Sequence, residues 1–158
     1  MNIKSLLVPL LLLTAGVALA DAPFTVSADG TDVTDGRTGL VWRRCAEGMA
    51  ATGGTCTGTA SIFTHEQALT RARDQATSTS AGWRLPNVKE LVSIVDRSKS
   101  NPAIDAVAFP ATSANAFWSS SPYLGSAGNA WAVYFLYGYD GGTARGVALP
   151  VRLVRAGQ

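Results

Sequence analysis

The stretch GWRLPNVKEL at residues 82–91 contains a turn, a tryptophan and the start of a helix. Asn87 and Glu90 have the identities and the spacing of a helix N-cap pair. The apolar residues that follow recur at helical spacing, so we predict a helix from Asn87 to about Arg97. Its buried face is predicted to comprise Val88, Leu91, Val92, Ile94 and Val95.

A second helix is predicted upstream of this stretch. Thr64 and Gln67 form a capping box, in which each residue satisfies a backbone N–H of the other. The residues that follow carry an apolar stripe at helical spacing, formed by Ala68, Leu69 and Ala72. We therefore predict a helix from Thr64 to about Ala76. His65, the only histidine, falls in its first turn, where we expect the imidazole to be exposed.

Beyond residue 116 the apolar pattern changes to the two-residue period of β-strands. The clearest strand has one face formed by Trp131, Val133 and Phe135 and another formed by Ala132, Tyr134 and Leu136. Two short strands are predicted around Pro150, and an early one at residues 40–42. Two helices followed by several strands indicate an α+β fold rather than alternating βαβ units.

The first 20 residues have the three parts of a secretory signal peptide. Lys4 is followed by an apolar run and by Ala18-Leu19-Ala20, which has the small residues that the signal peptidase requires. We expect cleavage to leave Asp21 as the first residue, with no membrane span in the 158 − 20 = 138 residues of the mature chain. The predicted organisation is a signal peptide at 1–20, a turn-rich lead-in at 21–32 and one domain at 33–156. The protein is expected in the periplasm, at the cell surface or in the medium.

Charge and cysteine content narrow the function classes further. The mature chain carries 12 basic and 11 acidic side chains, a balance without the basic excess of nucleic-acid-binding proteins. Cys45 and Cys56 flank a glycine-rich loop, and an even cysteine count in an exported chain predicts a disulfide. Without carboxylates, two cysteines and one histidine do not supply the four ligands of a structural zinc site.

Six motifs in a fixed order give the chain a family resemblance. They are TGLVW at 38–42, GWRLPNVKEL at 82–91, FP at 109–110, FWSSS at 117–121, AWAVYF at 130–135 and VRLVR at 151–155. In this order they resemble the Lcl C-terminal domain family, named for a collagen-like bacterial adhesin, over about residues 33–156. The resemblance implies a C-type-lectin-like fold in which the first and last strands pair.

The resemblance also suggests partners. The family includes an adhesin domain that binds sulfated glycosaminoglycans and forms trimers, whereas most members have no assigned activity. This chain lacks the collagen-like repeat of the adhesin. Because the adhesin domain forms trimers, a homo-oligomer of this chain is nevertheless left open.

Most of the conspicuous residues are interpreted as structural. The four tryptophans are predicted to lie in the core, because large aromatic side chains usually pack inside: Trp42, Trp83, Trp118 and Trp131. Arg84 is predicted to form an ion pair with Asp96. Asp29, Asp32 and Asp35 are spaced like calcium ligands, but no glutamate closes the loop, so we assign them to turns and predict no metal site.

The sequence does not predict an enzyme. No serine or cysteine nucleophile lies in a recognisable setting, so no catalytic triad is proposed, and no cofactor is expected. A non-catalytic, adhesin-like binding module is the favoured function. Its predicted ligand-binding residues are Tyr123, Tyr134, Leu136, Tyr137, Tyr139, Asp140 and Arg145. Tyrosine gives rigid, amphipathic contacts at low entropic cost, and Arg145 suits an anionic group.

The ligand is expected to be a glycan or a protein, and two other functions are open. The chain could instead be a structural or interaction subunit of the bacterial cell envelope or pilus. It could also be a variable binding protein diversified by a retroelement, since residues 119–155 contain no Lys, Glu, Gln or Met. Strand preference for Val, Tyr and Phe explains much of the same bias.

Overall fold

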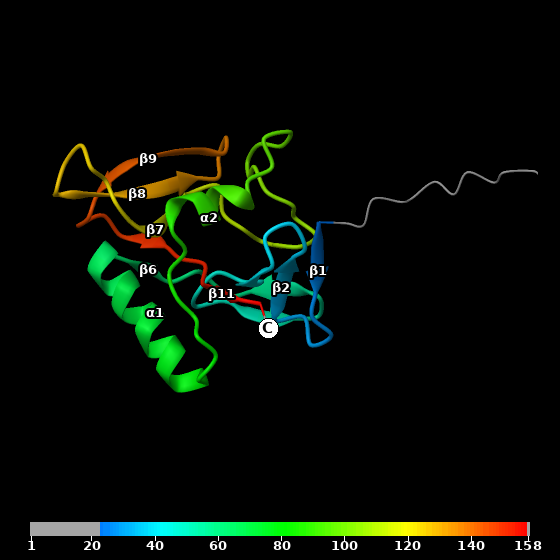
Figure 1. The fold of residues 1–158 in the computed structure, drawn as a ribbon. Helices are drawn as coiled ribbons and strands as arrows, with labels where there is room; N and C mark the ends of the chain where they lie inside the picture. Colours follow the sequence, from blue (N-terminus) through cyan, green and yellow to red (C-terminus); the bar gives the residue numbers. More distant parts are fainter. Residues whose placement is uncertain (1–22, 158) are drawn as a thin grey trace, which may run out of the picture.

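The computed structural model describes residues 23–157, so the predicted signal peptide and its cleavage site lie outside the described residues. The described residues form two helices and eleven short strands (Figure 1). The helices are α1 (His65–Thr79) and α2 (Val88–Ser93). The strands are β1 (Phe24–Val26), β2 (Asp32–Asp35), β3 (Leu40–Arg43), β4 (Ala50–Thr52), β5 (Thr55–Thr57), β6 (Ile62–Phe63), β7 (Ala116–Pro122), β8 (Asn129–Tyr134), β9 (Tyr139–Ala144), β10 (Leu149–Pro150) and β11 (Val154–Ala156). The predicted α+β class is confirmed.

The largest sheet joins the two ends of the described chain. Its strand order is β1-β2-β3-β11, with antiparallel pairing throughout. Val154 is opposite Trp42 and Ala156 is opposite Leu40, so the expected pairing of the early and final strands is confirmed. β1 was not predicted from the turn-rich lead-in. It is anchored by Phe24, whose ring packs edge-on against Phe109 at 5.1 Å.

A second, three-stranded sheet has the order β7-β8-β9, with β9 at its outer edge. Two small sheets, β10-β6 and β4-β5, complete the pairing. Figure 1 shows α2 between the β7–β9 sheet and the larger sheet, and α1 beside the strands β6 and β7. Leu91 of α2 is fully buried and belongs to a core cluster with Trp42 of one sheet and Phe117 of the other. The helix therefore joins the two sheets through apolar packing.

Both helices begin where the sequence predicts, and each has a complete capping box. α1 continues to Thr79, slightly beyond the predicted end. α2 ends at Ser93, so the prediction of a helix to Arg97 is wrong. The chain leaves the helix because Val95 forms a β-bridge with Ile104 and the Asp96 N–H donates to the carbonyl of Ala103.

Three of the four tryptophans are buried as predicted. Trp42 and Trp118 are inaccessible, and the buried ring of Trp83 packs against the guanidinium groups of Arg43 and Arg155, whose carbons lie 4.3 and 5.1 Å from its centroid. Trp131 is only half-buried, which contradicts its predicted place in the core. It lies on the central strand β8, where the ring of Tyr123 packs edge-on against it.

The GWRLPNVKEL stretch is held together by its own side chains. Arg84 donates two hydrogen bonds of 2.7 Å to the Glu90 carboxylate, which also accepts the Asn87 N–H at 2.8 Å. The predicted partner, Asp96, instead binds Ser98 and Lys99. Arg84 pairs with Glu90 because the start of α2 brings that carboxylate back over the preceding turn. This bidentate pair and the hydrogen bond from the Asn87 N–H lower the pKa of Glu90.

A disulfide and a set of hydrogen bonds fix the segment that follows β3. Cys45 and Cys56 form the predicted disulfide. The buried guanidinium of Arg152 donates to the carbonyls of Arg43 and Arg44 and to Thr112 Oγ1.

Across residues 23–157, neither helix has the length and apolar character needed to cross a membrane.

Replacement of Trp83 by alanine tests the division between interior and surface. Trp83→Ala should lower the free energy of unfolding by about 3–5 kcal/mol, because it removes a buried ring from the core and leaves a cavity. Tyr137→Ala, at an exposed position, should change it by less than about 0.5 kcal/mol. Urea unfolding of both variants measures the difference. Equal losses at the two positions would show that the assignment is wrong.

Candidate functional site

The turn between β8 and β9 carries the most exposed of the predicted binding residues. Tyr137 and Tyr139 are 65% and 51% exposed. Leu136 and Asp140 are exposed beside them. We refer to Leu136, Tyr137, Tyr139 and Asp140 as the tyrosine turn. These four predicted residues are brought together by the structure.

The tyrosine turn is fixed by its surroundings. The Asn101 N–H donates to the carbonyl of Leu136 at 2.9 Å, and the Gly138 N–H donates to that of Tyr134 at 2.9 Å. Gly138 has a φ of 74°, and a Cβ at this position would collide with the side chain of Val95. Only glycine fits this close approach without displacing its neighbours. The aromatic side chains therefore project from a backbone that is held against the core.

Tyr134 supports the turn rather than forming a contact surface of its own. Its half-buried ring stacks on that of Tyr139 with centroids 4.7 Å apart and planes 12° apart. Its hydroxyl lies 2.7 Å from Thr143 Oγ1. The stack fixes the orientation of the exposed Tyr139 ring.

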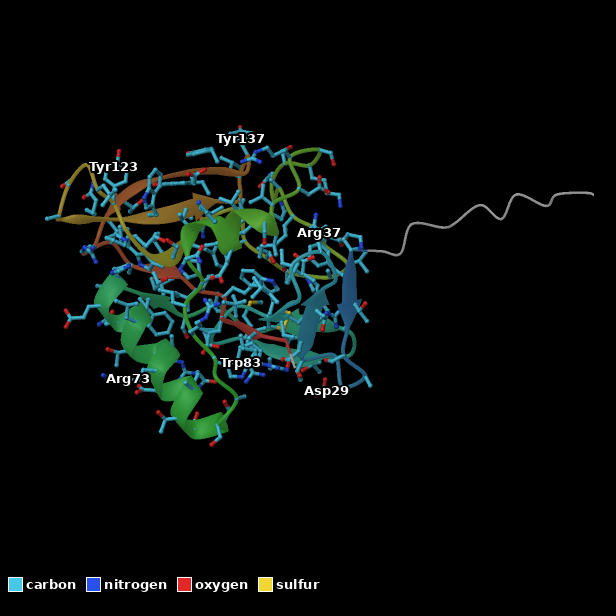
Figure 2. The ribbon with its side chains drawn as sticks, viewed as in Figure 1. Asp29, Arg37, Arg73, Trp83, Tyr123 and Tyr137 are labelled. Carbon is cyan, nitrogen blue, oxygen red and sulfur yellow. A yellow bond between two sulfur atoms is a disulfide. The ribbon has the colours of Figure 1, made fainter. Side chains whose placement is uncertain are left out.

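The remaining predicted tyrosine does not join this group. Tyr123 packs edge-on against Trp131 at 4.8 Å, and its ring covers Gly142. Figure 2 shows Tyr123 and Tyr137 at opposite ends of the β8–β9 layer. The prediction of one surface containing all four tyrosines is therefore wrong, because β8 and β9 separate them along their length.

The predicted binding face of β8 is also wrong. That face was expected to lie opposite Trp131, Val133 and Phe135. Ala130 and Ala132 on it are fully buried, in a core cluster with Trp118. Only the turn at the end of the strand leaves this layer and reaches the surface.

His65 is buried and contacts the half-buried Arg145, which corrects the expectation that His65 is exposed. His65 is 2% exposed and packs edge-on against Trp118. Its Nε2 lies 3.0 Å from the carbonyl oxygen of Ser119, and its Nδ1 lies 2.7 Å from Arg145 Nη1. A carbonyl accepts and a guanidinium donates, so these partners assign the neutral tautomer with the proton on Nε2.

The same contact determines the role of Arg145. Its Nε also donates to the carbonyl of Ala127 at 3.1 Å. It lies at the end of β9 away from the tyrosine turn, about six residues or 20 Å along an extended strand. Arg145 therefore ties the β7–β8 loop to the start of α1 instead of contributing to a ligand site at the tyrosine turn.

The three predicted turn aspartates point to separate partners. Asp29 accepts from Ser27 and Thr31, which lowers its pKa. Asp32 pairs with Arg43 and Arg155, whereas Asp35 pairs with Arg37. Within residues 23–157, no group of three or more His, Cys, Asp or Glu is placed to hold a metal ion.

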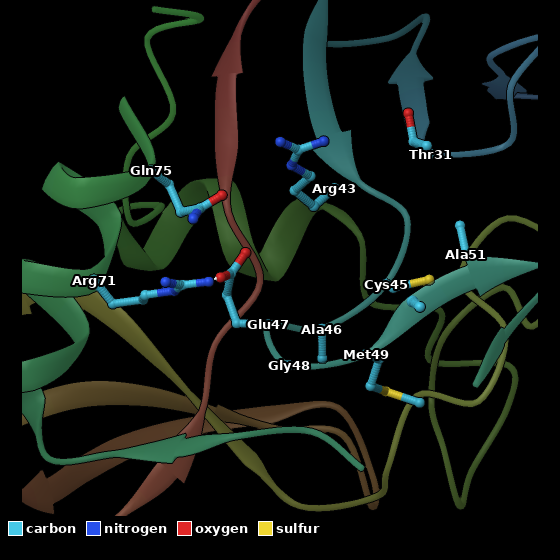
Figure 3. A pocket seen from close by; sticks show the side chains of 11 residues that line it. Thr31, Arg43, Cys45, Ala46, Glu47, Gly48, Met49, Ala51, Arg71 and Gln75 are labelled. Atoms are coloured by element: carbon cyan, nitrogen blue, oxygen red, sulfur yellow. Dashed lines mark hydrogen bonds and ion pairs between the residues drawn. The ribbon is translucent and has the colours of Figure 1, made fainter. Parts of the chain in front are cut away.

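A pocket that the sequence did not predict lies beside the disulfide (Figure 3). It has a volume of about 380 Å³ and lies between the β3–β4 connection and α1. Figure 3 shows the Gln75 side chain and the Glu47 carboxylate directed toward each other, with Arg71 joined to Glu47. The Arg71 Nε–Glu47 Oε2 distance is 2.7 Å, and Glu47 is 7% exposed. The spacing of Arg71 and Gln75 on one helix face was the only sequence signal for this site.

Comparison with known families identifies the chain. The model of the Lcl C-terminal domain matches residues 31–155. The chain belongs to the Lcl C-terminal domain family. This membership confirms the resemblance carried by the six motifs. No significant match is found among the curated proteins or among the solved structures.

Within this Lcl C-terminal domain, His65 predicts a pH-dependent stability. Burial lowers the pKa of His65 below its ordinary value of 6.5, and the charge of Arg145 acts in the same direction. The unfolded chain then binds a proton before the folded one does. The stability from neutral His65 is complete above about pH 6.5 and is lost as the pH falls below that value.

We therefore expect a lower urea midpoint at about pH 5 than at about pH 7.5. His65→Gln should weaken this pH dependence, because glutamine can still donate to Ser119 and accept from Arg145 but does not titrate. Carboxylates titrate in both proteins, so the difference between their profiles isolates His65. Identical profiles for the two proteins would contradict the assignment.

Proposed function

We propose that this Lcl C-terminal domain is an exported, non-catalytic binding module whose tyrosine turn contacts a glycan or protein ligand. The observation that carries the proposal is the exposure of Tyr137 and Tyr139 on a turn fixed by Gly138. Pre-organised aromatic side chains lose little entropy on binding. Exposed aromatic groups on an otherwise well-packed domain are typical of interaction surfaces.

The fold we propose for this module is C-type-lectin-like. Three features support it. The early strand β3 pairs with the final strand β11, two helices precede the later strands, and a separate three-stranded sheet carries the exposed turn. Loops and turns at the end of a rigid scaffold are the usual positions for binding residues.

Export and the absence of catalysis are parts of the same proposal. The disulfide is compatible with an oxidising compartment, and the three-part N-terminus supports export. The only histidine is enclosed by Trp118, Ser119 and Arg145. This enclosure leaves it poorly placed to act as a general base on a bound substrate.

An interaction subunit of the cell envelope is a second candidate, and one observation favours it. β9 is the outer strand of its sheet, and its six residues include neither proline nor lysine. Natural edge strands often carry such residues to prevent pairing with another chain. An open edge beside the tyrosine turn would suit a protein ligand that adds a strand.

A double substitution tests the proposed contact surface. Tyr137→Ala with Tyr139→Ala should weaken ligand binding by at least about tenfold, because buried interface tyrosines are frequent hot spots. The control, Leu124→Ala with Val107→Ala, removes exposed apolar side chains elsewhere and should have little effect. Binding to a glycan array and to immobilised envelope proteins measures both, and also separates the two candidate functions. Equal binding by both double variants would reject the tyrosine turn as the contact surface.

A further inference from the structure

The pocket between the β3–β4 connection and α1 is lined by polar side chains on a rigid base. The Glu47 N–H donates to the carbonyl of Val151 at 3.0 Å, and the Ser61 N–H donates to that of Glu47 at 2.8 Å. Gly48 has a φ of 89°, and a Cβ there would collide with Ser61. Together with the disulfide at Cys45, these contacts fix the backbone that carries Glu47. The pocket is therefore pre-formed.

Its side chains have hydrogen-bonding capacity that the fold does not use. Arg71 binds Glu47 through Nε, which leaves its two terminal nitrogens without a partner among the described residues. Glu47 uses Oε2 in this bond, so Oε1 keeps its capacity as an acceptor. Across residues 23–157 the side-chain amide of Gln75 also has no partner, and it lies in the same pocket. The unused groups combine several N–H donors with one carboxylate oxygen.

We infer that this pocket binds a small organic carboxylate that carries a hydroxyl or ammonium group next to its carboxylate. The terminal nitrogens of Arg71 match the planar geometry of a ligand carboxylate. The neighbouring hydroxyl or ammonium group donates to Glu47 Oε1. Arg43 also lines the pocket, but its charge is paired with Asp32, so Arg71 is the cation available to the ligand carboxylate.

Size and shape limit the ligand further. A volume of about 380 Å³ is at the small end of the range for ligand pockets, roughly 300–1,000 Å³. The lining contains no aromatic ring on which a pyranose could stack, and its apolar part is formed by Met49, three alanines and the disulfide. A hydroxy acid or an amino acid fits these properties better than a neutral sugar. The site is separate from the tyrosine turn and does not depend on its role.

The experiment is an NMR titration of the isotope-labelled mature protein with four small molecules. L-Lactate supplies a carboxylate with a hydroxyl group, and L-alanine supplies one with an ammonium group. Propionate retains the carboxylate alone, and glucose retains hydroxyl groups alone. We expect lactate or alanine, in the millimolar range, to shift the Glu47 backbone amide and the Gln75 side-chain amide. Propionate and glucose should bind at least about tenfold more weakly, because each lacks one charge-assisted hydrogen bond.

Variants on one helix locate the binding. Arg71→Gln should weaken binding by about tenfold or more, whereas Arg73→Gln, on an exposed part of α1, should leave it nearly unchanged. Gln75→Ala keeps the Glu47–Arg71 ion pair and a good helix former, so it tests the site in a folded protein. It should weaken binding severalfold, and the double tyrosine variant should bind normally.

Three results would overturn the inference. One is the absence of shifts with both lactate and alanine. The second is propionate binding as tight as theirs, which would show that Glu47 receives no hydrogen bond. The third is unchanged binding in both Arg71→Gln and Gln75→Ala, which would place the ligand elsewhere.

Discussion

The buried guanidinium of Arg152 is the contact on which the arrangement of this domain depends. It donates to the carbonyls of Arg43 and Arg44, at the end of β3, and to the hydroxyl of Thr112, before β7. Its face packs over the ring of Phe109 at 4.9 Å. One side chain from the final segment thereby holds the exit of the larger sheet and the entry to the second sheet. The disulfide begins at the next residue, Cys45, and extends this fixed region to β5.

Burying this charge opposes folding, and the hydrogen bonds offset the cost. Removal from water disfavours a charged group strongly unless polar partners replace the lost hydration. Burial lowers the pKa of Arg152 to about 9, which still leaves the group cationic at neutral pH. Among the described residues, the guanidinium of Arg152 donates to two backbone carbonyls and one hydroxyl, and none of these partners is a carboxylate. These hydrogen bonds fix the backbone at Arg43 and Arg44, just before Glu47 of the pocket.

Local sequence signals predicted the elements, while long-range contacts determined the site. Capping boxes at Thr64 and Asn87 are short-range patterns, so both helix starts could be read directly. The disulfide followed from cysteine content, and the pairing of β3 with the final strand β11 followed from the family motifs. The burial of His65 could not be predicted, because it depends on Ser119 and Arg145, which are 54 and 80 residues away in the chain. A two-residue period likewise assigns faces to a strand but does not say which face another layer will cover, and so Trp131 and the tyrosine face were misjudged.

The Arg152→Met variant tests the role of the guanidinium most directly. Methionine fills much of the same volume and removes the buried charge, but it leaves two carbonyls and one hydroxyl without their donor. We expect the free energy of unfolding in urea to fall by about 3 kcal/mol or more. Arg155→Met, which removes a partly exposed guanidinium from the same strand region, should cost clearly less. An Arg152→Met protein as stable as the natural one, or more stable, would show that apolar packing alone holds the two sheets together.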